Sequence, residues 1–170
     1  MMNILFVTGE AVPFIKTGGL ADVAGALPKE IKNKGNDIRV VLPLYSMIKQ
    51  EYRKDMKKID DFYVDIGWLH RYCGVFEYNL DGVIFYFIDN EQYFNRDGIY
   101  GFYDDAERFI FFSKAVVLMT KRLGFKPDVI HSNDWHSGLV SAYVNDFRTG
   151  DDFFKDTKTL YTIHNIKYQG

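Results

Sequence analysis

The sequence predicts an α/β fold, with a doubly wound, mainly parallel sheet and an antiparallel hairpin inserted in it. Two observations predict the parallel part. Short apolar runs without polar alternation, typical of parallel strands covered on both faces, recur along the chain. Segments with the 3–4 spacing of amphipathic helices lie between these runs. A third observation, apolar–polar alternation at 62–68 followed by two runs that flank Asp81-Gly82, predicts the antiparallel insertion over 62–88.

The first βαβ unit lies at the N-terminal end of the sequence. Residues 4–8 form an apolar run that predicts a strand, and a loop punctuated by glycines follows over 9–19. Apolar residues at 20, 24, 27 and 31 predict a helix after this loop. A second buried strand is predicted over 38–42, because that run is again continuously apolar.

The middle of the sequence has a different pattern. The charged stretch 51–58 is mixed in sign, which is typical of a solvated helix face. Alternation at positions 62, 64, 66 and 68 predicts a half-buried strand that includes Trp68. Residues 75–78 and 83–87 flank Asp81-Gly82 and are predicted to pair as a hairpin.

The α/β alternation returns after residue 104. Helical spacing over 109–123 ends at a glycine, and a short strand follows at 128–131. A second helix is predicted over 139–147 and a last strand over 159–163.

Composition narrows the functional classes. The 170 residues are 47% apolar, enough for the core of one domain, and 21 basic against 23 acidic residues give a net charge of −2. This balance excludes the basic footprint of a nucleic-acid-binding domain and the composition of a disordered chain. The single cysteine, Cys73, excludes an internal disulfide and a cysteine-based zinc site. No apolar run approaches the ~20 residues that span a bilayer. We therefore expect a cytoplasmic protein without nucleic-acid or membrane partners.

Polar clusters follow three of the predicted parallel strands. Residues 16–19 follow the first strand, Asp134 and His136 follow the strand at 128–131, and His164-Asn165 follow the strand at 159–163. Ligands of open α/β sheets bind beyond the carboxyl ends of the strands, where the strand order reverses. If the strand at 128–131 lies beside the first strand, the three clusters surround one crevice.

The loop with Gly18 and Gly19 has the chemistry of an anion site. Glycines let the backbone approach a ligand closely, and the next helix offers free N–H groups and a positive dipole end. Lys16 adds a mobile cation suited to a phosphate oxygen. The spacing matches neither the dinucleotide-binding nor the P-loop pattern, so a tight strand-to-helix turn with a surface lysine is the alternative.

The histidines permit two interpretations. His131, Asp134, His136 and His164 together could hold a zinc ion, but their spacing matches no zinc motif. We therefore expect no metal and no cofactor. Carboxylate, imidazole and amide groups instead suit hydrogen bonding to a polyhydroxylated ligand.

Aromatic side chains near these clusters leave their role open. Trp135 either stacks on a sugar face or belongs to the core, and burial statistics favour the core. The aromatic residues of segment 93–103 either line a groove or cover the sheet.

Four segments resemble motifs of the bacterial glycogen synthase and plant starch synthase family. KTGGLADV at 16–23 resembles the family's K-T-G-G-L-x-D-V, and HSNDWH at 131–136 resembles H-x-x-D-W-H. TIHNIKYQG at 162–170 resembles T-x-H-N-x-x-Y-Q-G, and VTGEAVP at 7–13 is similar to V-x-x-E-x-x-P. The four motifs occur in the family's order across the whole sequence.

The resemblance implies the N-terminal half of a two-domain GT-B glycosyltransferase. Residues 1–170 would be a truncated, Rossmann-like N-terminal domain, without the C-terminal nucleotide-binding domain. The implied reaction transfers glucose from ADP-glucose to the non-reducing end of an α-1,4-glucan such as glycogen, with retention and without an essential metal. The isolated fragment is expected to be inactive, because the second domain supplies the cations that hold the diphosphate.

The resemblance also implies roles for single residues. His164 would be catalytic, contacting the donor glucose and supporting the transition state, with Asn165 beside it. Lys16 and the glycine backbone would contact the donor or its diphosphate. Asp22 and Asp134 would order the donor and acceptor sides of the cleft. The complete set of substrate-binding residues implied in this way is Lys16, Gly18, Gly19, Asp22, Asp134, His136 and Asn165.

Three alternative functions remain at this point. The first is a UDP-glucose-using or sucrose-synthase-like transferase of the same architecture, although the K-T-G-G-L motif favours the glycogen and starch branch. The second is a non-catalytic glucan-binding module, which would not need an anion site at Lys16. The third is a nucleotide-binding domain alone, in which Asp134 and His164 would have no purpose.

Overall fold

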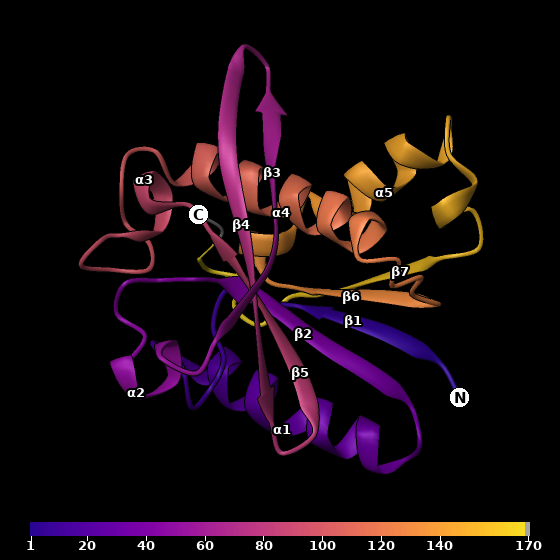
Figure 1. Ribbon diagram of the computed structural model, residues 1–170, viewed down its shortest axis with the longest axis horizontal. Helices are drawn as coiled ribbons and strands as arrows, with labels where there is room; N and C mark the ends of the chain where they lie inside the picture. The colour runs from indigo at the N-terminus through magenta and orange to yellow at the C-terminus, as the bar shows by residue number, and fades with distance from the viewer. Residues whose placement is uncertain (169–170) are drawn as a thin grey trace.

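The computed structural model describes residues 1–168, which form a seven-stranded sheet with helices on both faces (Figure 1). Its strand order is β3-β4-β5-β2-β1-β6-β7. Gln169 and Gly170, which end the last sequence motif, lie outside the described residues. The strands are β1 (Asn3–Val7), β2 (Asp37–Pro43), β3 (Lys57–Ile66), β4 (Leu69–Leu80), β5 (Val83–Asp89), β6 (Val129–Asn133) and β7 (Lys158–Thr162).

Helices cover both faces of the sheet, as the doubly wound prediction requires. α1 packs against β2 and β5 on one face, whereas α4 and α5 lie together on the other (Figure 1). The helices are α1 (Gly19–Asn33), α2 (Gln50–Arg53), α3 (Glu91–Phe94), α4 (Asp105–Arg122) and α5 (Val140–Arg148), with 3-10 turns η1 (Trp135–Ser137) and η2 (Asp152–Phe154). In the described part of the chain, no helix combines the length and apolarity needed to cross a membrane.

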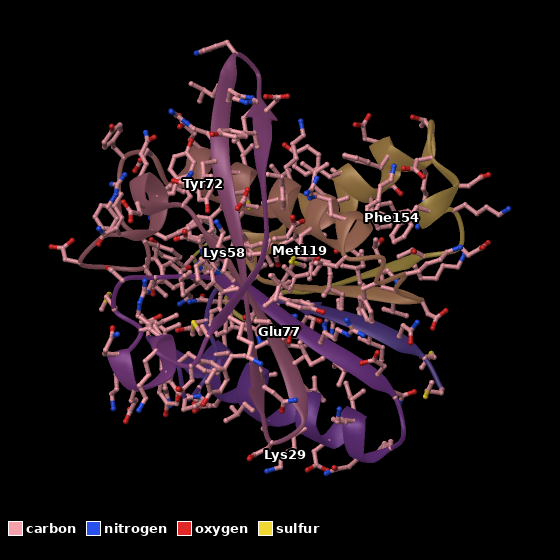
Figure 2. All side chains as sticks on the ribbon, in the orientation of Figure 1. Lys29, Lys58, Tyr72, Glu77, Met119 and Phe154 are labelled. Carbon is pink, nitrogen blue, oxygen red and sulfur yellow. The ribbon has the colours of Figure 1, made fainter. Side chains whose placement is uncertain are left out.

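The core is built on the continuously apolar strands. Leu5, Phe6 and Val7 of β1 are fully buried, because helices cover both sides of this central strand. The side chains in Figure 2 fill the space between α4 and the sheet, where Met119 is buried. Phe154 of η2 is buried against the aromatic ring of Phe147 in α5.

The predicted hairpin around Asp81-Gly82 is confirmed. Asp81 and Gly82 have φ angles of 51° and 83°, the two positive values that a type I′ turn between twisted strands requires. However, β5 also pairs in parallel with β2, so it belongs to the parallel scaffold. The prediction of an insertion over 62–88 was therefore wrong in extent, and the antiparallel addition consists of β3 and β4. β5 is continuously apolar because it is covered on both faces.

Two predictions on the stretch before this hairpin were also wrong. The segment 51–58 is not one solvated helix, because α2 ends at Arg53 and β3 begins at Lys57. The alternation does not continue to Trp68, which lies in the turn after β3 and is 94% exposed. The β3–β4 hairpin extends beyond the rest of the sheet (Figure 1), so no layer covers its tip.

The body of this hairpin is held to its surroundings by charged side chains. Arg122 of α4 donates hydrogen bonds to both carboxylate oxygens of Asp60 in β3, over 2.6 and 2.8 Å. Lys58 lies 5.5 Å from the centre of the Tyr72 ring across the strand pair (Figure 2).

Candidate functional site

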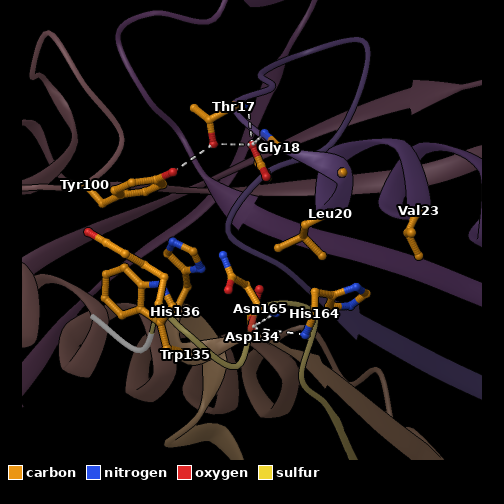
Figure 3. Close-up of a pocket in the computed structure, with 13 residues that line it drawn as sticks. Thr17, Gly18, Leu20, Val23, Tyr100, Asp134, Trp135, His136, His164 and Asn165 are labelled. Carbon is orange, nitrogen blue, oxygen red and sulfur yellow. Dashed lines mark hydrogen bonds between the residues drawn. The ribbon is translucent and has the colours of Figure 1, made fainter.

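The three polar clusters meet at the switch point of the sheet. β1 pairs with β2 on one side and with β6 on the other, and β7 follows β6, all in parallel. The prediction that the strand at 128–131 lies beside the first strand is therefore confirmed. A cavity of about 530 Å³ lies at this point (Figure 3). Its lining residues are Glu10, Thr17, Gly18, Gly19, Leu20, Val23, Tyr100, Asp134, Trp135, His136, His164, Asn165 and Tyr168.

Most of the predicted site residues line this cavity, and two do not. Lys16 and Asp22 are absent from its lining, and they form an ion pair in which Lys16 Nζ lies 2.7 Å from each carboxylate oxygen. Their side chains are 51% and 57% exposed. The predicted residues that line the cavity are Gly18, Gly19, Asp134, His136, His164 and Asn165.

Glu10 organises the glycine loop. The backbone N–H groups of Thr17 and Gly18 donate hydrogen bonds to Glu10 Oε2, and Thr17 Oγ1 donates to the same oxygen over 2.8 Å. The Glu10 carboxylate, 4% exposed, thus occupies the concave turn that successive N–H groups form. Gly19 and Leu20, the first residues of α1, line the cavity, and because no side chain caps this helix, their N–H groups have no capping partner.

Asp134 organises the opposite side. Its Oδ1 accepts hydrogen bonds from the backbone N–H groups of His164 and Asn165, over 3.2 and 3.4 Å. Asp134 has φ 57° and ψ 177°, a strained backbone conformation that is found mainly at glycine. The loop after β6 therefore fixes the start of the loop after β7.

His136 belongs to an aromatic wall of the cavity. Its ring stacks on Trp135 with a centroid distance of 4.1 Å and meets the edge of Phe109 at 4.8 Å. Burial, and secondly the positive charge of Arg108, lower the pKa of His136 to about 3. The ring is therefore neutral at pH 7. Both ring nitrogens are buried and neither has a hydrogen-bond partner among residues 1–168, so the ring keeps one donor and one acceptor unsatisfied at this wall.

The sequence left open whether Trp135 and the aromatic residues of segment 93–103 line a ligand site or belong to the core, and the structure shows both. Trp135 is half-buried, packs against the core and also lines the cavity. Within the aromatic run, Tyr93 and Phe94 are fully buried, whereas Tyr103 is fully exposed. Tyr100 of this run reaches the cavity, where its hydroxyl lies 3.4 Å from Thr17 Oγ1.

Several lining residues had no role in the sequence-based site. Glu10 offered a signal, because a polar residue directly follows the first strand within a motif. Leu20 and Val23 have the spacing of core positions on a helix, so nothing in the sequence marked them as cavity residues. The lining residues without any role in the sequence-based site are Glu10, Leu20, Val23 and Tyr168, whereas Thr17 belongs to the predicted glycine loop and the roles of Tyr100 and Trp135 had been left open.

The histidines do not gather around a common point. His131 Nε2 lies 2.8 Å from Thr162 Oγ1 within the sheet, and burial lowers the pKa of His131. Across residues 1–168, no three His, Cys, Asp or Glu side chains are grouped so that they could hold a metal ion.

A parallel sheet with a polar cavity at its switch point defines the class of open α/β domains that bind a ligand at the carboxyl ends of their strands. The chain belongs to the starch synthase catalytic domain family, whose model matches residues 3–170. This membership confirms the resemblance drawn from the four motifs.

Relatives and a solved structure agree with this assignment. The chain is 57% identical over 169 residues to a glycogen synthase of Finegoldia magna and 53% identical over 170 residues to one of Clostridium botulinum. It matches the catalytic domain of Starch Synthase IV from Arabidopsis thaliana bound to ADP and acarbose with a TM-score of 0.90 and 26% identity, covering 98% of this chain and 34% of that one. The alignments cover 99% of this chain but 36% of each of the two bacterial proteins, so it spans about a third of their length.

Proposed function

We propose that the chain is the N-terminal domain of a glycogen synthase that transfers glucose from ADP-glucose to the non-reducing end of an α-1,4-glucan, with retention. The observation that carries this proposal is the assembly of residues from all four family motifs around one cavity at the switch point of the sheet. Relatives named glycogen synthase, and a similar structure described as bound to ADP and acarbose, support the same reaction.

The donor diphosphate would bind at the start of α1. The N–H groups of Gly19 and Leu20 and the positive end of the helix dipole favour an anion there. Lys16 would exchange its partner Asp22 for a phosphate oxygen. This exchange costs little free energy, because an ion pair as exposed as this one contributes less than about 1 kcal/mol to stability.

The sugar would bind across the cavity from the helix. His164, Asn165 and His136 offer hydrogen-bond donors and acceptors to its hydroxyl groups. The rings of Trp135 and Tyr100, which lie edge to face with centroids 6.2 Å apart, offer apolar surface for a sugar face. In this proposal His164 is the residue that contacts the donor glucose during transfer.

A second domain would complete the site. Departure of the nucleoside diphosphate needs preorganised positive charge, and Lys16 alone does not supply a clamp. In the proposed enzyme, the portion of the relatives' length that this chain does not span would bring most of the nucleotide contacts. We therefore expect the 170-residue chain alone to show no glucose transfer.

Transfer of labelled glucose from ADP-glucose and from UDP-glucose onto glycogen tests the proposal in the full-length protein. The Lys16→Ala and His164→Ala variants should each lose at least about two orders of magnitude in kcat/KM with ADP-glucose, because each removes a contact to the reacting donor. Lys29→Ala is the matched control, since Lys29 lies in α1 in an equally exposed ion pair with Asp81. It should retain full activity.

The other outcomes select an alternative function. Transfer from UDP-glucose alone would keep the fold and assign the protein to another transferase branch. No transfer from either donor, with binding of glycogen intact, would favour the non-catalytic glucan module. Full activity of both the Lys16 and His164 variants would contradict the proposed site.

A further inference from the structure

A buried amide lies behind the proposed catalytic histidine. Asn133 is the last residue of β6 and is fully buried. Its Nδ2 donates hydrogen bonds to the carbonyl oxygens of Val7 and His131, over 3.1 Å each. A primary amide nitrogen has two hydrogens, and carbonyl oxygens only accept. Both hydrogens are therefore engaged, and the opposite amide orientation would place Oδ1 against two acceptors.

This orientation directs the amide oxygen of Asn133 at His164. Asn133 Oδ1 lies 3.0 Å from His164 Nε2. An amide oxygen only accepts hydrogen bonds, so Nε2 must carry the hydrogen. A neutral imidazole has one protonated nitrogen, so Nδ1 is then the unprotonated one.

The surroundings of the ring agree with this assignment. The neighbouring carboxylate of Asp134 accepts the backbone N–H of His164, so its hydrogen bond fixes the backbone rather than the ring. Within the described residues, Asn133 is the hydrogen-bond partner of the ring and Nδ1 has none. The second ring nitrogen is therefore the one left for a ligand.

We infer that Asn133 is a positioning residue that holds the His164 ring as its Nε2–H tautomer and leaves Nδ1 as a hydrogen-bond acceptor. Its hydrogen bonds to Val7 and His131 anchor this arrangement to the two central strands of the site. A ligand group that meets Nδ1 must then be a donor, such as a sugar hydroxyl. This last step rests on the proposed function, whereas the tautomer follows from the hydrogen bonds alone.

The tautomer can be measured in the ligand-free chain labelled with ¹⁵N at histidine. The chain has four histidines, and the His164→Ala variant identifies the signals of His164. Two-bond ¹H–¹⁵N correlation spectra at a pH where the ring is neutral distinguish the protonated from the unprotonated nitrogen. We expect a single Nε2–H tautomer in the wild type. An Nδ1–H tautomer or an even mixture would overturn the inference without need of any variant.

Variants then test whether Asn133 is the cause. Asn133→Ala removes the acceptor and should give a mixture of both tautomers. Asn133→Asp keeps an acceptor oxygen toward Nε2, but its second oxygen faces the carbonyl oxygens of Val7 and His131. This variant should therefore be less stable than the wild type and still give the single Nε2–H form, which a merely structural role of Asn133 would not predict. Asn145→Ala is the control, because that asparagine accepts a hydrogen bond from Arg148 on the surface of α5. An unchanged tautomer in a folded Asn133→Ala variant would contradict the inference.

Failure of the inference and failure of the proposed function are distinguishable. The spectra need no substrate, so a protein without transferase activity can still show the predicted tautomer. Conversely, an active transferase with the wrong tautomer would reject only the role of Asn133.

Discussion

The backbone N–H of His164 donates a hydrogen bond to Oδ1 of Asp134 over 3.2 Å, so a residue after β6 fixes the first residue of the loop after β7. The Asp134 carboxylate is 7% exposed, and it is therefore a structural acceptor within the site. Glu10 plays the same part on the other side of the cavity, where it accepts the N–H groups of Thr17 and Gly18. Both acidic side chains of the cavity thus stabilise a loop conformation.

Asp134→Ala should destabilise the fold far more than Asp134→Asn. Alanine removes the acceptor of two backbone N–H groups, and this loss costs about 2 kcal/mol in the free energy of unfolding. Asparagine keeps one acceptor oxygen and is subject to the same backbone strain as aspartate, so its effect should stay below about 1 kcal/mol. Urea unfolding measures both values.

Hydrogen exchange locates the effect of this change. The amides of residues 164 and 165 should lose protection in Asp134→Ala and keep it in Asp134→Asn. Equal protection in the two variants would show that the carboxylate does not hold this loop.

Gly9→Ala should displace the aromatic wall of the cavity. A Cβ at this position would lie 2.6 Å from Cγ of His136, whose ring is buried and has no room to retreat. Overpacking of this kind destabilises a fold by about 1–3 kcal/mol, and we expect a lower urea midpoint and altered ring signals of His136. Gly150→Ala is the control, because nothing lies within 4 Å of a Cβ there. A Gly9→Ala variant as stable as this control would contradict the packing.

Much of the scaffold was predictable, because burial on both faces leaves a direct mark on sequence. The continuous apolar runs of β1 and β2 and the Asp81-Gly82 turn each specify their structure locally. The hairpin tip was not predictable in the same way. In the sequence, Trp68 continues the apolar spacing of positions 62, 64 and 66, but in the structure it lies in the turn after β3, beyond the covering layers and in solvent.

The residues of the candidate site were likewise predictable only in part. Polar residues at strand ends, such as Asp134 and His164, were identifiable because the topology of parallel sheets places strand ends together. Side chains that reach the cavity from other elements, such as Val23 and Tyr100, depend on packing that has no sequence period. The pairing of Lys16 with Asp22 was also not predictable, since two exposed charges have many possible partners.

His136 should make the stability of the fold depend on pH. Its pKa of about 3 lies below the ordinary value of 6.5, so between these values the unfolded chain binds a proton that the folded chain excludes. The stabilisation is complete above pH 6.5 and is lost as the pH falls toward 3, by roughly 1 kcal/mol per pH unit.

Urea unfolding of the wild type and of His136→Leu between pH 4 and pH 7 isolates this contribution. Leucine does not titrate, so the variant should lose stability less steeply on acidification. His131, whose pKa is also lowered, contributes equally to both proteins and cancels in the difference. Parallel pH profiles would mean that folding does not lower the pKa of His136.

Cys73 reports on opening of the β3–β4 hairpin. Its thiol is fully buried on β4, which pairs with the edge strand β3, and burial raises the pKa of the thiol. A thiol reagent can therefore label Cys73 only after the structure around this thiol opens. Because β3 is an edge strand, we expect this opening to occur without unfolding of the central sheet, so Gly9→Ala should leave the labelling rate unchanged.

Arg122→Ala should raise the rate of Cys73 labelling about two- to fivefold. It removes the paired hydrogen bonds between α4 and Asp60 of β3, and an ion pair as exposed as this one contributes up to about 1 kcal/mol. Lys121→Ala is the matched control, because the neighbouring Lys121 pairs with Asp151 instead. If Gly9→Ala accelerates labelling as much as it destabilises the whole fold, then Cys73 is exposed only by global unfolding and the hairpin does not open independently.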